Sequence, residues 1–116
     1  MKNKECLENK ECSITCPMEF AMTQISGKWK LIILWNIYKK EVIRYGDLKR
    51  SINNITDKML SNQLKELVRD NIVHKKVYQE IPLRVEYSLT KSGESLIPIM
   101  KMLFKWGETV MGELKS

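Results

Sequence analysis

The sequence predicts a mainly α-helical domain that carries one small β-hairpin. Apolar residues recur at helical spacing in several separate segments, and two short segments at residues 72–78 and 84–89 alternate with the period of strands. The length agrees with this fold class, because 116 residues can build one modest core but not two. We therefore expect residues 1–116 to form a single domain.

The first half of the chain predicts three helices and one extended segment. The first helix is expected to begin at Pro17 and to end at Ser26-Gly27, where the apolar period stops. A strongly apolar second helix covers residues 29–40. Residues 42–44 are extended at most, and residues 46–52 form a brief third helix with two apolar residues facing inward.

A fourth helix follows a tight turn at Asn53-Asn54. Thr56 is expected to be its N-cap, and the helix is expected to run to about Asp70. Asn71 stands where a helix often ends in a left-handed residue. The buried face is expected to consist of Met59, Leu60, Leu64, Leu67 and Val68.

Two strands and a long final helix complete the chain. Pro82 lies in the loop between the strands, and Thr90 is expected to cap one continuous helix that reaches Lys115. A short helix, a tight turn, a longer helix and a hairpin form the winged helix-turn-helix arrangement. The predicted fold is therefore a winged helix-turn-helix with a β-hairpin wing and with N- and C-terminal dimerisation helices.

The polar face of the fourth helix indicates contact with a DNA duplex. A formal net charge of +6 favours a polyanionic partner, and the major groove is about as wide as a helix. Hairpin cations can reach the backbone or the minor groove. The alternatives are an ordinary amphipathic surface helix, and an Arg84 that pairs with Glu80 or Glu86. The candidate DNA-binding residues are Thr56, Lys58, Ser61, Asn62, Lys65, Lys75, Lys76 and Arg84.

Three segments resemble the HxlR-type family of bacterial transcription regulators. They are "GKWKLIILW" at residues 27–35, "KMLSNQLKELVRDNIVHK" at residues 58–75 and "PLRVEYSLTKSGESL" at residues 82–96. The resemblance implies a MarR-like winged helix homodimer that binds operator DNA. Asn71 stands where relatives commonly carry glycine, and asparagine can adopt the same backbone conformation.

The final helix, expected within residues 90–116, predicts dimerisation. Its apolar residues, among them Phe104 and Trp106, extend past the part that the wing could shield. A two-fold pair of reading helices would match an inverted-repeat operator. We expect Phe20 and Ile25 to pack with Leu103, Val110 and Leu114 across the dimer. The alternative is that the helix folds back over its own chain.

Cys16 stands directly before Pro17 and is expected to be the N-cap of the first helix. Thiols at helix N-termini ionise more readily than free thiols. The family resemblance implies a cysteine at this position that senses oxidants or electrophiles, and Cys6 or Cys12 could then form a disulfide with it. A passive thiol is the main alternative. Zinc held by the three cysteines, with His74 or water, is a weaker one, and we predict no metal.

Other function classes find little support in the sequence. No phosphate-binding glycine loop, paired carboxylates or nucleophile elbow is present, so we predict no enzyme activity and no cofactor. Residues 1–15 are expected to form a mobile, charged arm rather than a signal peptide, and no apolar run could cross a bilayer. We expect a cytoplasmic protein without a membrane partner. The open alternatives are a constitutive or small-molecule-responsive regulator without thiol sensing, and a protein-binding winged helix.

Overall fold

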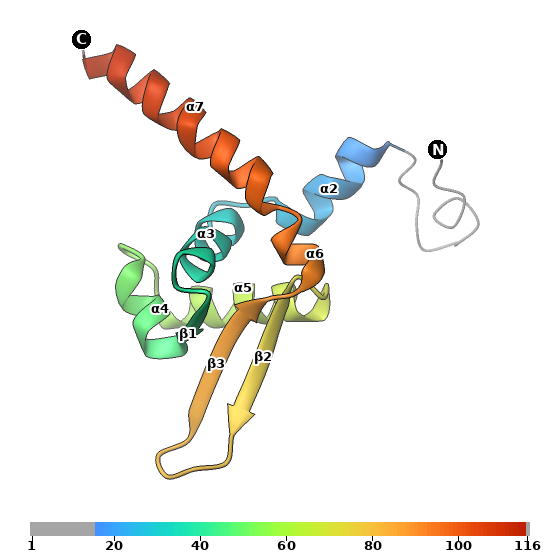
Figure 1. Ribbon diagram of the computed structural model, residues 1–116, viewed down its shortest axis with the longest axis vertical. Helices are drawn as coiled ribbons and strands as arrows, with labels where there is room; N and C mark the ends of the chain where they lie inside the picture. The colour runs from blue at the N-terminus through green and yellow to red at the C-terminus, as the bar shows by residue number, and fades with distance from the viewer. Residues whose placement is uncertain (1–15, 116) are drawn as a thin grey trace.

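The computed structural model describes residues 16–115, and it confirms a mainly helical winged helix-turn-helix (Figure 1). The predicted arm, with Cys6 and Cys12, lies outside the described residues. The elements, in chain order, are α2 (Pro17–Ile25), α3 (Lys30–Lys40), β1 (Val42–Arg44), α4 (Tyr45–Ser51), α5 (Asp57–Arg69), β2 (Val73–Tyr78), β3 (Arg84–Leu89), α6 (Lys91–Glu94) and α7 (Ile97–Lys115).

The core lies between α3, α4, α5 and the sheet. Ile33, Leu34 and Ile37 of α3 are fully buried, as is Leu48 of α4. From α5 the buried side chains are Leu60, Leu64 and Leu67. Each such side chain contributes about 1.5–3 kcal/mol relative to exposure, so this cluster fixes the orientation of α5 against the rest of the domain.

The sheet has three antiparallel strands in the order β1-β3-β2. The expected hairpin is present, with Val73 opposite Leu89 and Tyr78 opposite Arg84. The extended segment at Val42–Arg44 also pairs with β3, an addition that the sequence did not predict. Beyond this third strand the hairpin projects from the domain as a wing beside α5 (Figure 1).

Residues next to each end of α5 determine where the helix begins and ends. Thr56 is the N-cap as predicted, since its hydroxyl accepts a hydrogen bond from the backbone N–H of Met59 at 3.1 Å. Asn71 has a φ of 60°. Its N–H donates to the carbonyl of Val68, and the N–H of Ile72 donates to the carbonyl of Leu67. This pair of bonds is the Schellman arrangement, which stops the helix where the sequence predicted.

The expected burial of Met59 is wrong, because its side chain is 39% exposed. Leu60, Leu64 and Leu67 repeat at four and three residues and define the stripe that faces the core. Met59 precedes Leu60 by one residue, which rotates its side chain by about 100° from the centre of that stripe. It therefore lies at the edge of the buried face.

The final helix is not continuous from Thr90, which corrects that prediction. The Thr90 hydroxyl caps only α6, where it accepts from the N–H of Gly93 at 3.1 Å. The chain then turns at Ser95, and α7 begins at Ile97. Pro98 explains the break, because proline has no N–H to continue the ladder but fits the first turn of a helix.

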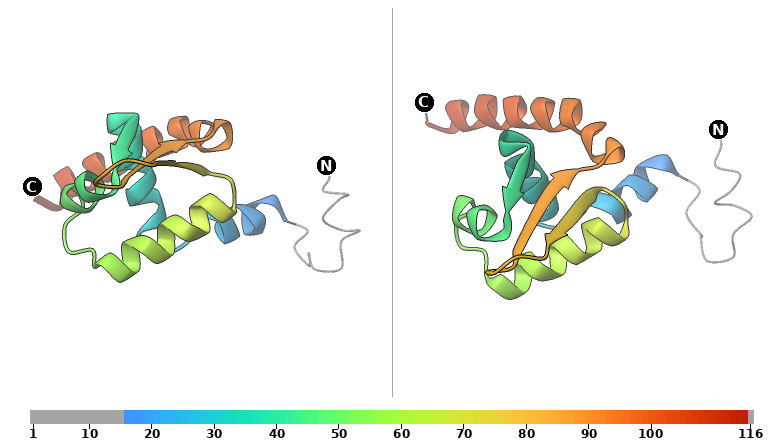
Figure 2. Two further views of the ribbon diagram at one scale, coloured as in Figure 1. Left: turned by 90° about the horizontal axis from the view of Figure 1, so that it is seen from below. Right: turned by 60° about the horizontal axis from the view of Figure 1, so that its bottom comes forward.

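The first turns of α7 pack on α3, and the rest of α7 projects away from the domain (Figure 1). Met100 is buried, and the Phe104 ring stacks on Trp35 with 5.1 Å between centroids. Both views of Figure 2 keep α7 on the opposite side of the domain from α5. In the described part of the chain, no helix is both long and apolar enough to cross a bilayer.

Candidate DNA-binding surface

The exposed face of α5 gathers five of the predicted residues. Thr56, Lys58, Asn62 and Lys65 are exposed, and Ser61 is half-buried. Lys58, Asn62 and Lys65 lie on the side of the helix away from Leu60, whereas Ser61 lies at the edge of the buried face. The side chains are short polar groups and two ammonium groups, which can bond to base edges or phosphates in a major groove.

A hollow of about 370 Å³ lies between α5 and the wing, and Lys75 of the wing lines it on the side that faces α5. Lys75 lies opposite Tyr87 in the sheet register, on the face of the hairpin that is turned toward α5. Lys65 and Arg69 of α5 line the same hollow, over apolar groups of Leu64, Val68 and Tyr87. The cations of helix and wing therefore form one surface.

Lys76 and Arg84 lie on the other face of the hairpin. Their register partners are Glu86 and Tyr78. The Arg84 guanidinium is 3.0 Å from Glu80 and 3.4 Å from Glu86, and it lies 3.8 Å from the centroid of the Tyr78 ring. The carboxylate pairing considered from the sequence is thus present. Contact of Arg84 with DNA stays a prediction, and this geometry instead gives its charge a role within the wing.

Tyr45, at the start of α4, belongs to the surface and was missed from the sequence. Its hydroxyl oxygen is 3.0 Å from Oδ1 of Asp57 and 3.2 Å from Oγ of Ser61. Burial raises the pKa of Tyr45, and the Asp57 carboxylate adds to this while the Ser61 hydroxyl opposes it. No local pattern marks the contact, because the three residues come from two helices joined by a turn.

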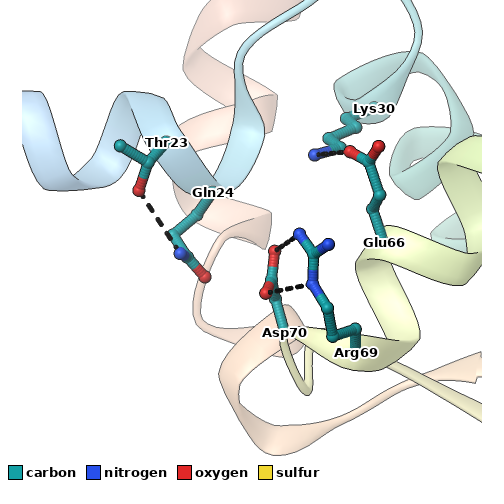
Figure 3. A network of polar contacts seen from close by, with 6 residues as sticks. All are labelled: Thr23, Gln24, Lys30, Glu66, Arg69 and Asp70. Carbon is teal, nitrogen blue, oxygen red and sulfur yellow. Dashed lines mark hydrogen bonds and ion pairs between the residues drawn. The ribbon is translucent and has the colours of Figure 1, made fainter. Parts of the chain in front are cut away.

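An ion pair between the buried Lys30 and the partly exposed Glu66 fixes α5 against the start of α3 (Figure 3). Nζ of Lys30 lies 2.7 Å from Oε1 of Glu66, and Lys30 is only 5% exposed. The hydrogen bond from Lys30, and then its charge, lower the pKa of Glu66. One turn further, Arg69 pairs with Asp70 at 3.2 Å. Glu66 therefore neutralises a buried cation.

Cys16 is the N-cap of α2, as predicted. Its backbone is extended, with φ −94° and ψ 123°, Pro17 follows as the first helical residue, and the Cys16 carbonyl accepts from the N–H of Phe20 at 3.0 Å. The side chain is exposed and makes no capping hydrogen bond. Among residues 16–115 no group of three His, Cys, Asp or Glu side chains could hold a metal, and the zinc alternative needs Cys6 and Cys12.

Exposed apolar side chains are concentrated on α2 and on α7, of which α7 lies on the opposite side of the domain from α5 (Figure 2). Trp106 is 67% exposed and Leu114 is 80% exposed, and Phe20 of α2 is 48% exposed. Ile25, which was expected to pack across a dimer, is instead buried within its own chain. Apolar surface of this extent on α2 and α7 is typical of a protein–protein contact.

Comparisons with known proteins agree with this arrangement. A family model described as HxlR-like helix-turn-helix matches residues 24–115. The uncharacterised HTH-type transcriptional regulator YdzF of Bacillus subtilis is 46% identical over 91 residues, which are 78% of this chain and 84% of that protein. The uncharacterised HTH-type transcriptional regulator YybR of the same organism is 40% identical over 115 residues, which cover 99% of this chain and 89% of that protein.

Among solved structures, the redox regulator HypR in its reduced form is similar to this chain. The TM-score is 0.79 at 40% sequence identity, over 86% of this chain and 98% of the HypR chain. HypR in its oxidised form has a TM-score of 0.76 at 42% identity, over 81% of this chain and 96% of that chain.

Proposed function

The chain belongs to the HxlR-like helix-turn-helix family, whose similar members are transcriptional regulators, and from this premise we propose that it binds a specific DNA operator as a homodimer. The observation that carries the proposal is the polar and cationic face of α5, joined to the wing by Lys65 and Lys75 across one hollow. Helix α5 would lie in the major groove, where Ser61 and Asn62 reach base edges and Lys58 and Lys65 reach phosphates.

A homodimer accounts for the apolar surface of α2 and α7. In a two-fold dimer the same patch meets its own copy, and Phe104, Trp106 and Leu114 would lose their exposure to water there. Because α7 lies on the opposite side of the domain from α5 (Figure 2), both reading helices of such a dimer remain free. The operator is then an inverted repeat with its half-sites about one helical turn apart.

We further propose that Cys16 adjusts the DNA affinity of this dimer. The thiol is exposed at the N-cap of α2, one turn from the apolar surface at Phe20, and the similar protein HypR is a redox regulator. A peroxide would take up two electrons from the thiolate, its O–O bond would break, and a sulfenic acid and water or an alcohol would form. A second thiol could then displace water and form a disulfide. Either product changes the contact of α2 with its surroundings.

The operator proposal is tested by selecting duplexes from a random pool and titrating the preferred duplex against a scrambled one. We expect binding to the preferred duplex at least about a thousandfold tighter, with a steep loss of affinity as salt rises. Equal affinity for both duplexes, or no binding, would favour a protein-binding winged helix. The same titration is repeated after peroxide treatment of the wild type and of Cys16→Ser. If treatment changes the operator affinity of neither protein, the chain is a regulator without thiol sensing.

A further inference from the structure

The hydroxyl of Tyr45 joins the reading helix at two points of its DNA-facing side. It lies 3.0 Å from Oδ1 of Asp57 and 3.3 Å from the carbonyl oxygen of the same residue. On the other side it lies 3.2 Å from Oγ of Ser61. Asp57 and Ser61 are one helical turn apart on α5, so a single phenol from α4 spans the first turn of the reading helix.

The chemistry of these groups gives the chain of hydrogen bonds one direction. A carboxylate and a carbonyl only accept, whereas a phenol has a single proton to donate. The proton of Tyr45 must therefore point toward Asp57, since two unprotonated oxygens at 3.0 Å would repel each other. Ser61 is left as the donor to Tyr45. Burial, and to a lesser extent Asp57, raise the pKa of the Tyr45 phenol, so the phenol keeps the proton that it donates.

We infer that Tyr45 is a specificity-determining positioning residue, which makes Ser61 an acceptor toward DNA. A free serine hydroxyl can donate or accept and so distinguishes bases poorly. With its proton directed to Tyr45, Ser61 presents only lone pairs to the groove, and Asp57 beside it presents only acceptors as well. The inference rests on the proposed function, in which α5 lies in the major groove.

An acceptor at this point selects one class of base. In the major groove adenine and cytosine expose an exocyclic amine, whereas guanine and thymine expose carbonyl oxygens. The amine donates to Ser61, while a carbonyl would face another acceptor and leave both unpaired. One position of the operator should therefore prefer adenine or cytosine over guanine or thymine on the contacted strand.

The test measures binding to a preferred duplex and to every single base-pair change of it. The proteins are the wild type, Tyr45→Phe, Ser61→Ala and the double variant. Tyr38→Phe serves as the matched control, since Tyr38 lies on α3 beside Trp35. Phenylalanine keeps the ring of Tyr45 and removes only the hydroxyl, and thermal melting of each protein checks that the fold is retained.

We expect the wild type to prefer the amine-bearing bases at one position by about fivefold or more. Tyr45→Phe and Ser61→Ala should both reduce the preference at that same position, and the double variant should add nothing to Ser61→Ala. Tyr38→Phe should keep it. An unchanged preference in Tyr45→Phe, a uniform loss of affinity, or a change at a different position from Ser61→Ala overturns the inference. A wild type that prefers no duplex refutes the proposed function itself.

Discussion

Replacing Gly93 of α6 with alanine should destabilise the joint between the reading helix α5 and the wing, which is the turn at Asn71 and Ile72. A Cβ at position 93 would lie 2.3 Å from the carbonyl oxygen of Ile72 and 3.3 Å from two side-chain atoms of Leu89. The carbonyl is backbone, and it accepts a hydrogen bond from the N–H of Thr90 at 3.0 Å. The Thr90 hydroxyl lies 3.0 Å from the same carbonyl but is closer to the carbonyl of Asn71, at 2.7 Å. The extra methyl group cannot fit without moving the residues that follow α5.

The size of the effect follows from these contacts. Displacing the Ile72 carbonyl weakens its hydrogen bond from the Thr90 N–H, which is worth about 1 kcal/mol. Overpacking against Leu89 adds about 1–3 kcal/mol. We expect a total loss of about 2–4 kcal/mol, which for a chain of this size lowers the melting temperature by roughly 8–20 °C.

Thermal unfolding followed by circular dichroism measures this loss, and Gly46→Ala is the matched control. A Cβ at Gly46, in the first turn of α4, meets nothing closer than the Arg50 guanidinium at 3.6 Å. Alanine there should stabilise the protein by roughly 0.5–1 kcal/mol. If Gly93→Ala melts within a few degrees of the wild type, the close approach of α6 to Ile72 is not what holds the joint.

Three further substitutions test the N-cap of α5, a cation on its exposed face, and its ion pair with α3. Thr56→Ala removes the acceptor for the Met59 N–H and should cost about 1 kcal/mol in urea unfolding, whereas Thr56→Ser should cost much less. Lys65→Ala should weaken binding to all duplexes alike and reduce the salt slope by about 1; an unchanged slope would remove Lys65 from the phosphate contacts. Because Lys30 lowers the pKa of Glu66, this carboxylate stabilises the fold above its ordinary titration range and loses that effect as pH falls through its lowered pKa. The melting temperatures of wild type and Glu66→Gln should therefore differ most near pH 7 and converge on acidification below about pH 5; a gap that stays constant with pH would contradict the ion pair.

Features of α5 were predictable because their signals are local. The buried stripe of Leu60, Leu64 and Leu67 repeats at helical spacing, Thr56 precedes it as a cap, and Asn71 ends it. The same reasoning located Cys16, since Pro17 marks a first helical residue. Met59 was misplaced because spacing alone does not fix which edge of an apolar stripe meets the core.

Contacts between distant segments were not predictable from spacing. The pairing of β1 with β3 joins Ile43 to Tyr87, and the ion pair joins Lys30 to Glu66. The residue types are ordinary in each case, and only the fold brings them together. The break before α7 is a different case. Pro98 is a local signal for the start of a helix, but a continuous helix from Thr90 was predicted in spite of it.

The most direct test of the account is chemical footprinting of the protein on its preferred duplex. Cleavage by hydroxyl radicals reports protected backbone, and methylation at guanine N7 reports protection in the major groove. We predict two protected major-groove segments related by a two-fold axis and about one helical turn apart, as a dimer with two copies of α5 requires. A single protected segment, or protection without any methylation change in the major groove, would contradict reading of DNA by α5 in a homodimer.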